Sequence, residues 1–573
     1  MERIGKLLCL ILAFLMLFGV FAGCGGKKET DGSAPQETPE PAEPSPVVEE
    51  TEVPEKEKIT FPLAETLELT IALPIAPFAN ALITELYDWT LFKEMEKITN
   101  VHWEGQLHPA LHATDTFSMM ITSGDWPDVM ANLDMVTKNG NYQCCKDEVI
   151  IELTDLVKEY APHVWELIAS DTDLALNLMY EAEDGENILL NFPMVNEIPS
   201  TNQESGLQYR GDWLDELGME VPETISEFEA VLEAFKVNYN SMYYIGNTYD
   251  GLPISSAFNV RINYDEIAAE GVGFPLYVRD GKVVCGLLQD EFLEYLTLAN
   301  KWYKAGYIHP DFYTGISANI DAEPGRIESG EFGAYTAGLS TFSFINDTFK
   351  ENGSGAYMVA GPYLMNDNRD QRHLDAVRHK MRNRCWTIST KCQYPEIVCA
   401  WVDYLFTDEG YILYNYGVEN EHFYYNEKDE PTLNDFILKN PDGLPPIMTE
   451  YVYTNNEASH VPGRLLLSKT LAGYDEEVLA AREVWLDSLH SSDWVIPRAV
   501  TLNDEENEIY NSIFGDILTY FQELNLSFVT GAVSLDEFDA YRQQLIEMGM
   551  DTIVELYQNA YDRYLQRVAA LKG

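Results

Sequence analysis

Residues 67–131 alternate between strand-like and helix-like patterns, and this alternation constrains the fold more than any other feature. Residues 67–74 alternate apolar and polar side chains as a strand does, and a helix with one apolar face is expected to begin in the 80s. A second helix, over 114–122, separates a strand around Val101 from another at 128–131. Because strands that alternate with helices pack as layers, this part of the sequence predicts an α/β fold.

Helical periods dominate the rest of the chain. They cover residues 153–160, 213–217, 225–235, 291–305, 395–406, 504–524 and 535–568. Thr224 followed by Glu227 is typical of a capping box at a helix start. The last two periods predict a helical C-terminal part.

The first 24 residues are typical of an export signal. Arg3 and Lys6 precede an uninterrupted apolar run from Leu7 to Val20, and small residues end the run just before Cys24. The run is shorter than the ~20 residues with which a helix crosses a membrane. We therefore expect a signal peptide over 1–23, with a signal anchor left in place as the alternative.

The junction at Cys24 resembles the lipobox of bacterial lipoproteins. In those proteins the cysteine thiol takes a diacylglyceryl group, and cleavage makes the cysteine the first residue. This resemblance implies lipidation at Cys24 and a protein held at the extracellular face of the cytoplasmic membrane by its lipid anchor only.

Residues 25–58 contain six prolines, ten acidic residues and four lysines, with almost no large apolar side chains. Such a segment cannot bury enough surface to offset the entropy of ordering its backbone. We expect a disordered acidic, proline-rich linker that, with Cys24, covers residues 24–58.

The net charge of −57 argues against two classes of partner. A strongly acidic surface repels phosphate backbones and anionic lipid headgroups, so nucleic-acid binding is not expected.

The body of the chain also has six cysteines that match no disulfide framework and no CxxC zinc pattern, so we expect buried thiols. These are Cys144, Cys145, Cys285, Cys385, Cys392 and Cys399.

No motif of a catalytic or cofactor-binding site is present. The sequence has no GxSxG elbow, Walker loop, complete GxGxxG or HExxH, and no calcium loop of the Asp-x-Asp-x-Asp-Gly type. His108 and His112 have the spacing of zinc ligands on a helix, but Pro109 between them and the missing glutamate argue against a metal site. We therefore expect no catalytic residue, no cofactor and no metal.

Several stretches together resemble one family, the extracellular solute-binding proteins of ABC importers, in the long lipoprotein branch associated with oligosaccharide uptake. Their order and spacing carry the resemblance. They are MMITSGDWPDVM at 119–130, VIIELTDLVKEYAP at 149–162, YRGDWLDELGMEVP at 209–222, WYKAGYIHPDF at 302–312, EFGAYTAG at 331–338, the segment 386–410 and the tail 528–563.

The resemblance implies a two-lobe, hinge-linked, periplasmic-binding-protein-like fold of type II with extra C-terminal helices. On this basis residues 59–190 form the first part of lobe 1, and residues 191–382 form the first part of lobe 2. Residues 383–430 return to lobe 1, and residues 431–573 form a helical part that belongs mainly to lobe 2.

The same resemblance implies a monomeric carrier that captures an oligosaccharide and delivers it to ABC permease subunits on other chains. Such a carrier closes by hinge rotation on its ligand and needs no catalytic group. Two alternatives remain open: a secreted carbohydrate-active enzyme, and the same carrier fold binding peptides or another polar solute.

Candidate ligand-binding residues follow from strand ends and from aromatic positions. Open α/β sheets bind ligands beyond the carboxyl ends of their strands, which nominates Asn80, Asn132 and Asp134. Arg210 and Asp212 either bind ligand hydroxyls or pair with each other.

Three aromatic residues are candidates for stacking on a sugar ring. Trp126 lies in the turn before a strand. Tyr335 is expected past a strand, where sugar binders of this family often place a stacking aromatic. Trp386 lies at the expected crossing between the lobes, where it either lines the cleft or stiffens the hinge.

Overall fold

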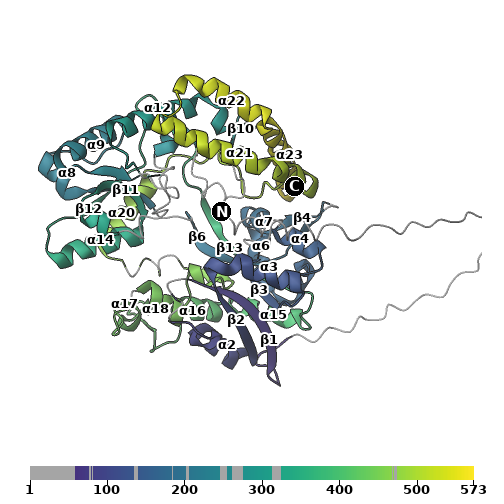
Figure 1. Cartoon of the computed structure of the whole chain (residues 1–573). Helices are drawn as coiled ribbons and strands as arrows, with labels where there is room; N and C mark the ends of the chain where they lie inside the picture. Colours follow the sequence, from purple (N-terminus) through teal and green to yellow (C-terminus); the bar gives the residue numbers. More distant parts are fainter. Residues whose placement is uncertain are drawn as a thin grey trace, which may run out of the picture. The chain divides into compact units, whose positions relative to one another are not determined.

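A six-stranded mixed sheet organises the first lobe, with strand order β16-β6-β13-β3-β1-β2 (Figure 1). Its strands are β1 (Leu67–Ile75), β2 (Val101–Pro109), β3 (Val129–Ala131), β6 (Phe192–Thr201), β13 (Arg378–Ile388) and β16 (Gly463–Leu465). β1 runs parallel to β2 and β3, whereas β13 runs antiparallel to β3 and β6.

The computed structural model describes residues 59–572 apart from 77, 78, 80, 81, 134–139, 183, 184, 202–204, 245–253, 261–274, 311, 313–323, 445, 467, 468, 470, 472 and 473.

Helices and one large aromatic cluster complete the first lobe. The helices are α2 (Thr90–Thr99), α3 (Ala113–Ser123), α4 (Gly140–Lys146), α5 (Thr154–Tyr160), α6 (Pro162–Ser170), α7 (Thr172–Leu178), α15 (Pro395–Tyr404), α16 (Asp408–Tyr416), α17 (Asp435–Leu438) and α18 (Pro446–Tyr453). Trp386 lies at the centre of the core, with its ring 5.4 Å from that of Trp103 and 5.2 Å from that of Trp401.

A four-stranded sheet of order β12-β7-β11-β8 organises the second lobe. Its strands are β7 (Ser205–Arg210), β8 (Met242–Tyr244), β11 (Phe332–Gly338) and β12 (Met358–Gly361). The helices are α8 (Gly211–Leu217), α9 (Ile225–Tyr239), α12 (Asp290–Ala305), α13 (Pro324–Glu328), α14 (Leu339–Asn352), α20 (Glu476–Asp487), α21 (Asp504–Thr530), α22 (Phe538–Glu547) and α23 (Met550–Lys572). Two hydrophobic clusters, separate from that of the first lobe, form its core.

Three short hairpins extend these layers. They are β4 (Tyr180–Glu181) with β5 (Asn187–Ile188), β9 (Leu276–Arg279) with β10 (Lys282–Cys285), and β14 (Phe423–Tyr425) with β15 (Pro431–Leu433). The first hairpin packs through Tyr180 and Ile188 against a hydrophobic cluster of the first lobe.

The described chain passes between the two sheets at three places. β6 leads into β7, β12 leads back into β13, and β16 leads to α20, which packs against β7 and β12. β6 and β13 form an antiparallel pair that runs from Phe192 with Trp386 to Thr201 with Arg378, with register shifts along its length. Two α/β layers with separate cores and three crossings confirm the predicted two-lobe, hinge-linked fold class.

Most predicted elements of the described chain are present. The capping box of Thr224 and Glu227 forms at the start of α9. The first predicted helix is present as α2, but it begins at Thr90 rather than in the 80s, where a 3₁₀ turn at Leu86–Asp88 precedes it. The predicted helix 535–568 is broken at Gly549, whose φ of 107° lies in the left-handed region that favours glycine.

The lobe boundaries need two corrections. β6, which we assigned to lobe 2, pairs with β13 and β16 in the first sheet. Residues 431–465, which we assigned mainly to lobe 2, also belong to the first lobe, because Tyr451 and Val461 are buried in its core. The six cysteines of the body are thiols; Cys144, Cys285, Cys385 and Cys399 are buried, as expected, whereas Cys145 and Cys392 are half-buried.

Candidate functional site

The carboxyl edges of both sheets face the crossing strands. In the first sheet, Ala131 at the end of β3 pairs with Trp386, and β13 and β6 continue together beyond this pair. In the second sheet, Gly338 at the end of β11 pairs with Ser205, the first residue of β7. Because ligands of open α/β sheets bind beyond such edges, the region around the crossing strands is the candidate site.

Asn132 lies at this edge, where the sequence predicted it. It directly follows β3 in a left-handed conformation with a φ of 63°, and it is buried. Its backbone N–H donates to the carbonyl oxygen of Cys385 over 2.6 Å, which fixes the residue against β13. Asn80 and Asp134 lie outside the described residues.

A buried ion pair stands beside the same edge. Lys469, on the third crossing, places its Nζ 3.7 Å from Oε2 of Glu450 and donates to Thr454 Oγ1 over 3.3 Å. The side chains of Lys469 and Glu450 are 0% and 2% exposed. Burial lowers the pKa of Lys469, while the Glu450 carboxylate raises it. The hydroxyl of Tyr451, next to Glu450, accepts the backbone N–H of Ala76 after β1 over 3.4 Å. The Lys469–Glu450 ion pair therefore links the third crossing to the edge of the first sheet.

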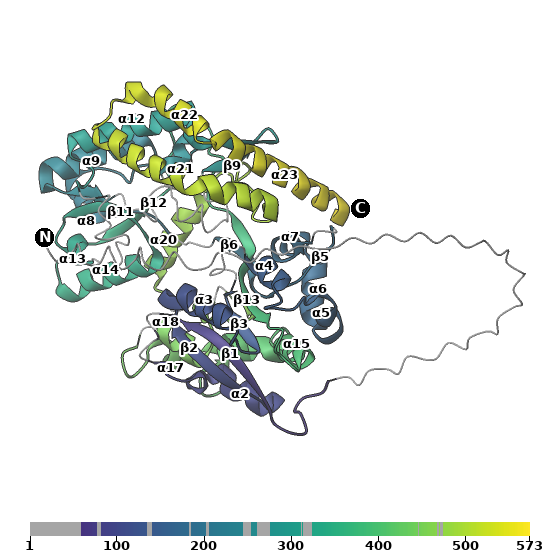
Figure 2. The ribbon, with the colours of Figure 1, turned by 45° about the vertical axis from the view of Figure 1, so that its right-hand side comes forward.

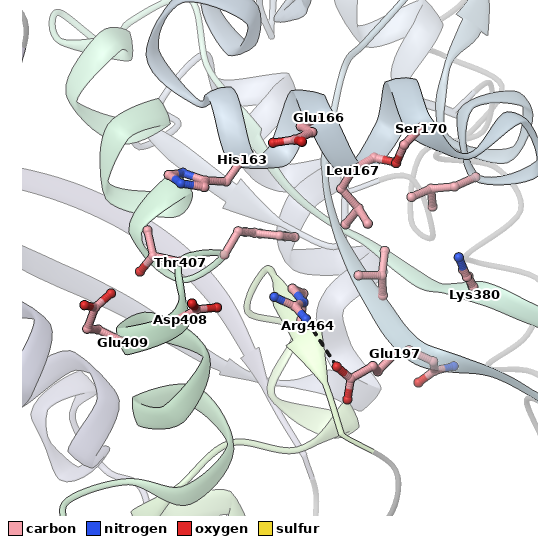
Figure 3. A pocket seen from close by; sticks show the side chains of 14 residues that line it. His163, Glu166, Leu167, Ser170, Glu197, Lys380, Thr407, Asp408, Glu409 and Arg464 are labelled. Atoms are coloured by element: carbon pink, nitrogen blue, oxygen red, sulfur yellow. Dashed lines mark hydrogen bonds and ion pairs between the residues drawn. The ribbon is translucent and has the colours of Figure 1, made fainter.

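A cavity of about 540 Å³ lies on the crossing strands (Figure 3). Its walls come from β6, β13, β16, α6, α7 and the start of α16. The lining residues are His163, Glu166, Leu167, Ser170, Leu174, Val195, Asn196, Glu197, Lys380, Phe406, Thr407, Asp408, Glu409 and Arg464. This volume is in the range of small-ligand pockets.

The basic side chains of this cavity already have acidic partners. Arg464 lies 3.2 Å from Glu197, Lys380 lies 2.6 Å from Asp171, and His163 lies 2.7 Å from Asp403. Figure 3 shows the Arg464–Glu197 contact, and it shows Glu409 and Asp408 on the side of the cavity opposite α6. The wall therefore offers hydrogen-bond acceptors together with an apolar floor, and it suits a neutral, hydroxylated molecule better than an anion.

The two polar candidates at the end of β7, Arg210 and Asp212, pair with each other. Arg210 donates from Nε and Nη2 to the two carboxylate oxygens of Asp212 over 2.8 and 2.6 Å. Its guanidinium also lies 4.3 Å from the ring centre of Trp213. Because Arg210 ends β7, whose first residue is at the crossing, both residues lie at the edge of the second sheet away from the hinge. This geometry supports an ion pair between Arg210 and Asp212 rather than contact of either side chain with a ligand.

The three aromatic candidates do not come together at the site. Trp126 precedes β3, so it lies at the opposite end of this strand from Asn132, where Lys391 covers its ring at 4.8 Å. Tyr335 lies inside β11 rather than past it, and it is 0% exposed in an apolar cluster. Trp386 is also 0% exposed, in the first-lobe core. The placements expected for Tyr335 and for a cleft-facing Trp386 are therefore wrong for this structure, because neighbouring side chains cover both rings.

Sequence reasoning missed the charged residues of the crossing strands. Lys380, Arg464 and Lys469 belong to no motif, and each lies near its acidic partner only because the chain returns to the first lobe twice. Of these three positions, only Arg464 could have been noticed in the sequence. It is an isolated charge directly before the short apolar run Leu465–Leu467.

None of the helices in the described part of the chain has both the length and the hydropathy of a membrane span. In the same residues, no group of three or more His, Cys, Asp or Glu side chains is arranged to hold a metal ion.

Comparisons with known proteins support the resemblance carried by the sequence motifs. No family model matches the chain. It is 30% identical over 190 residues to the fructooligosaccharide ABC transporter substrate-binding protein FusA of Streptococcus pneumoniae serotype 4 (strain ATCC BAA-334 / TIGR4), which covers 31% of this chain and 33% of FusA. It is 26% identical over 239 residues to lipoprotein LipO of Bacillus subtilis (strain 168), which covers 39% of this chain and 42% of LipO. The matched segments thus cover a third of the length of FusA and less than half of the length of LipO.

Solved structures show the fold over nearly the whole length. A solute-binding protein from Bifidobacterium longum infantis, described as binding HMO and as associated with an ABC transporter, superposes with a TM-score of 0.70 at 16% identity, covering 87% of this chain and 99% of that one. FusA of S. pneumoniae with kestose gives 0.67 at 18% identity, with the same coverage. The alginate-binding protein AlgQ2 gives 0.64 at 21% identity, covering 88% and 100%. The chain therefore has the fold of these solute-binding proteins, and the resemblance seen in the sequence is confirmed.

Proposed function

We propose that this protein is the solute-binding component of an ABC importer, and that it captures an oligosaccharide outside the cell. The observation that carries the proposal is the arrangement of two α/β layers with separate cores, joined by three crossings of which two form the antiparallel β6–β13 pair. This arrangement allows a hinge rotation that leaves both cores intact. The two relatives, a substrate-binding protein and a lipoprotein, fit a carrier that transforms nothing.

Hinge closure would couple ligand binding to delivery. A ligand that binds one lobe and gains contacts to the other in the closed form shifts the open–closed equilibrium by the difference between its two affinities. The closed form is then the one that permease subunits, on other chains, distinguish from the empty carrier. The protein acts as a monomer in this scheme.

The N-terminal segments support a tethered location. The apolar run ending at Cys24 and the acidic linker to residue 58 would hold the body outside the cytoplasmic membrane on acyl chains. Similarity to a lipoprotein is consistent with this anchor.

The ligand we favour is a neutral oligosaccharide. Structures with this fold are described as binding kestose, HMO and alginate, of which alginate is anionic. The net charge of −57 on this chain disfavours an anionic ligand, because long-range repulsion reduces its local concentration.

A glycan panel tests the proposal. The purified chain is titrated with kestose, a neutral milk tetrasaccharide, a mannose oligosaccharide and an alginate oligomer, and stability is followed by thermal denaturation. A true ligand at 100 times its Kd is expected to add about 2.7 kcal/mol to the free energy of unfolding. Mass analysis of the recovered sugar must show it unchanged. A hydrolysed sugar would identify an enzyme, and stabilisation by peptides alone would identify a different carrier.

Asn132→Gly is expected to weaken binding of the sugar found in that panel by about tenfold. Glycine keeps the left-handed backbone at this edge and removes one side-chain amide, whose hydrogen bonds contribute about 1–2 kcal/mol. Isothermal titration measures the change. Asn240→Gly, at a left-handed helix end on α9, is the matched control and should bind as the wild type does. Unchanged affinity in Asn132→Gly would remove this residue from the site.

A further inference from the structure

The last helix of the chain makes contacts in both lobes. Its first half belongs to the second lobe, where Met550, Ile553, Tyr557 and Ala560 are buried with residues of α12, α21 and α22. Gln558 also accepts the backbone N–H of Val283 in β10 over 2.8 Å. α23 therefore moves with the second lobe.

The end of α23 binds the first lobe through one buried arginine. Arg567 is 8% exposed and donates from Nε and Nη2 to Oδ1 of Asn187 over 3.1 and 2.8 Å. Nη2 also donates to the carbonyl oxygen of Met179 over 3.2 Å, and Glu181 lies 3.9 Å away. All three partners lie on or next to the β4–β5 hairpin, which packs on the first-lobe core. Figures 1 and 2 both show this end of α23 beside α7 and the hairpin.

This contact lies next to the crossing strands. α7, which precedes the hairpin and contacts α23, is joined to β13 at both ends. Lys380 of β13 lies 2.6 Å from Asp171 at the start of α7, and Arg384 of β13 donates to the carbonyl oxygen of Asn177 over 2.5 Å. A contact near a rotation axis moves less than one at the mouth of a cleft, so it can persist while the lobes rotate.

We propose that the end of α23 is a fourth connection between the lobes, a non-covalent brace that restricts how far and in which direction they rotate. This inference goes beyond the proposed function, because it concerns the mechanics of the fold and holds whatever the ligand is. A guanidinium with several hydrogen bonds to one hairpin fixes an orientation that a single apolar contact does not.

The test compares Arg567→Met with a matched variant of the same helix. Arg563→Met also removes an arginine of α23, but Arg563 pairs with Glu506 of α21 over 2.7 Å, inside the second lobe. Asn187→Ala removes the acceptor from the first-lobe side and keeps the test valid if Arg567→Met folds poorly. All variants are studied as the full chain without ligand.

Two readouts separate a brace from a merely stabilising contact. In Arg567→Met and Asn187→Ala, amide hydrogen exchange should become about tenfold faster in residues 561–570 and 179–188, because charge-assisted hydrogen bonds are lost. Small-angle scattering of the same samples should show a wider distribution of interatomic distances than the wild type. Arg563→Met, which loses hydrogen bonds to Glu506 within the second lobe, should leave exchange in residues 179–188 and the scattering unchanged.

Two outcomes would overturn the proposal. Faster exchange with unchanged scattering would mean that the contact forms but does not restrict the lobes. Unchanged exchange in both segments would mean that the contact does not protect them in solution.

Discussion

Glu450→Gln is expected to lower the free energy of unfolding by about 3–5 kcal/mol at pH 7, because it leaves the ammonium of Lys469 buried without its counter-charge. Both side chains are almost fully buried, so solvent cannot replace the lost carboxylate. Urea denaturation followed by tryptophan fluorescence measures the change. The matched control is Asp435→Asn, which breaks an ion pair with Lys439 whose partners are 80% and 76% exposed, and which should cost less than about 0.5 kcal/mol.

The pH dependence of Glu450→Gln identifies the cause of the loss. Burial already lowers the pKa of Lys469, and removing Glu450 removes the group that raises it. The folded-state pKa then lies below the value in the unfolded chain. Between these two values the unfolded chain binds more protons, so stability rises with pH. The deficit relative to wild type should therefore shrink as the pH is raised above 7. A deficit that stays constant up to pH 10 would show that packing, and not a buried charge, is responsible.

Trp386→Ala is expected to cost about 3–5 kcal/mol of unfolding free energy, because it empties the centre of the first-lobe core. The rings of Trp103 and Trp401 lie within 5.4 Å of it and would lose their contact surface. Chemical denaturation measures this loss. Trp126→Ala, which removes a half-buried ring at the other end of β3, should cost only about 1 kcal/mol.

This comparison also decides the role of Trp386. A ligand-stacking tryptophan loses binding and keeps stability when it is truncated, whereas a core tryptophan loses stability first. Wild-type stability in Trp386→Ala would contradict the packing described above and would return this residue to the list of ligand contacts.

Local sequence patterns predicted helices and strands well where the residues that determine an element are close together in the chain. The strand at 67–74 corresponds to β1, and the helix at 114–122 corresponds to α3 within one residue at each end. The Thr224–Glu227 capping box depends on residues three apart, so the sequence alone specifies it. The start of the first helix was predicted too early, because the apolar pattern continues from the 3₁₀ turn at Leu86–Asp88 into α2.

The candidate site was predicted less completely. Asn132 was found because a strand end is a local feature with a general consequence for ligand binding. Arg210 and Asp212 were left open between two roles, and only the register of β7 places them away from the hinge. Tyr335 and Trp386 were proposed as ligand contacts, and their burial depends on side chains from distant segments.

The sequence alone predicted the class of this protein, because its alternating strands and helices and the order of its motifs resemble those of solute-binding proteins. It also predicts an export signal and an acidic linker, which lie outside the described residues. These features depend on residue order over short distances. Only the tertiary structure decided that residues 431–465 return to the first lobe, that Lys469 meets Glu450, and that Arg567 reaches the β4–β5 hairpin. The Arg567 contact joins residues 380 positions apart in the chain. No local pattern encodes such pairs, because they form only when packing of the two cores brings the segments together.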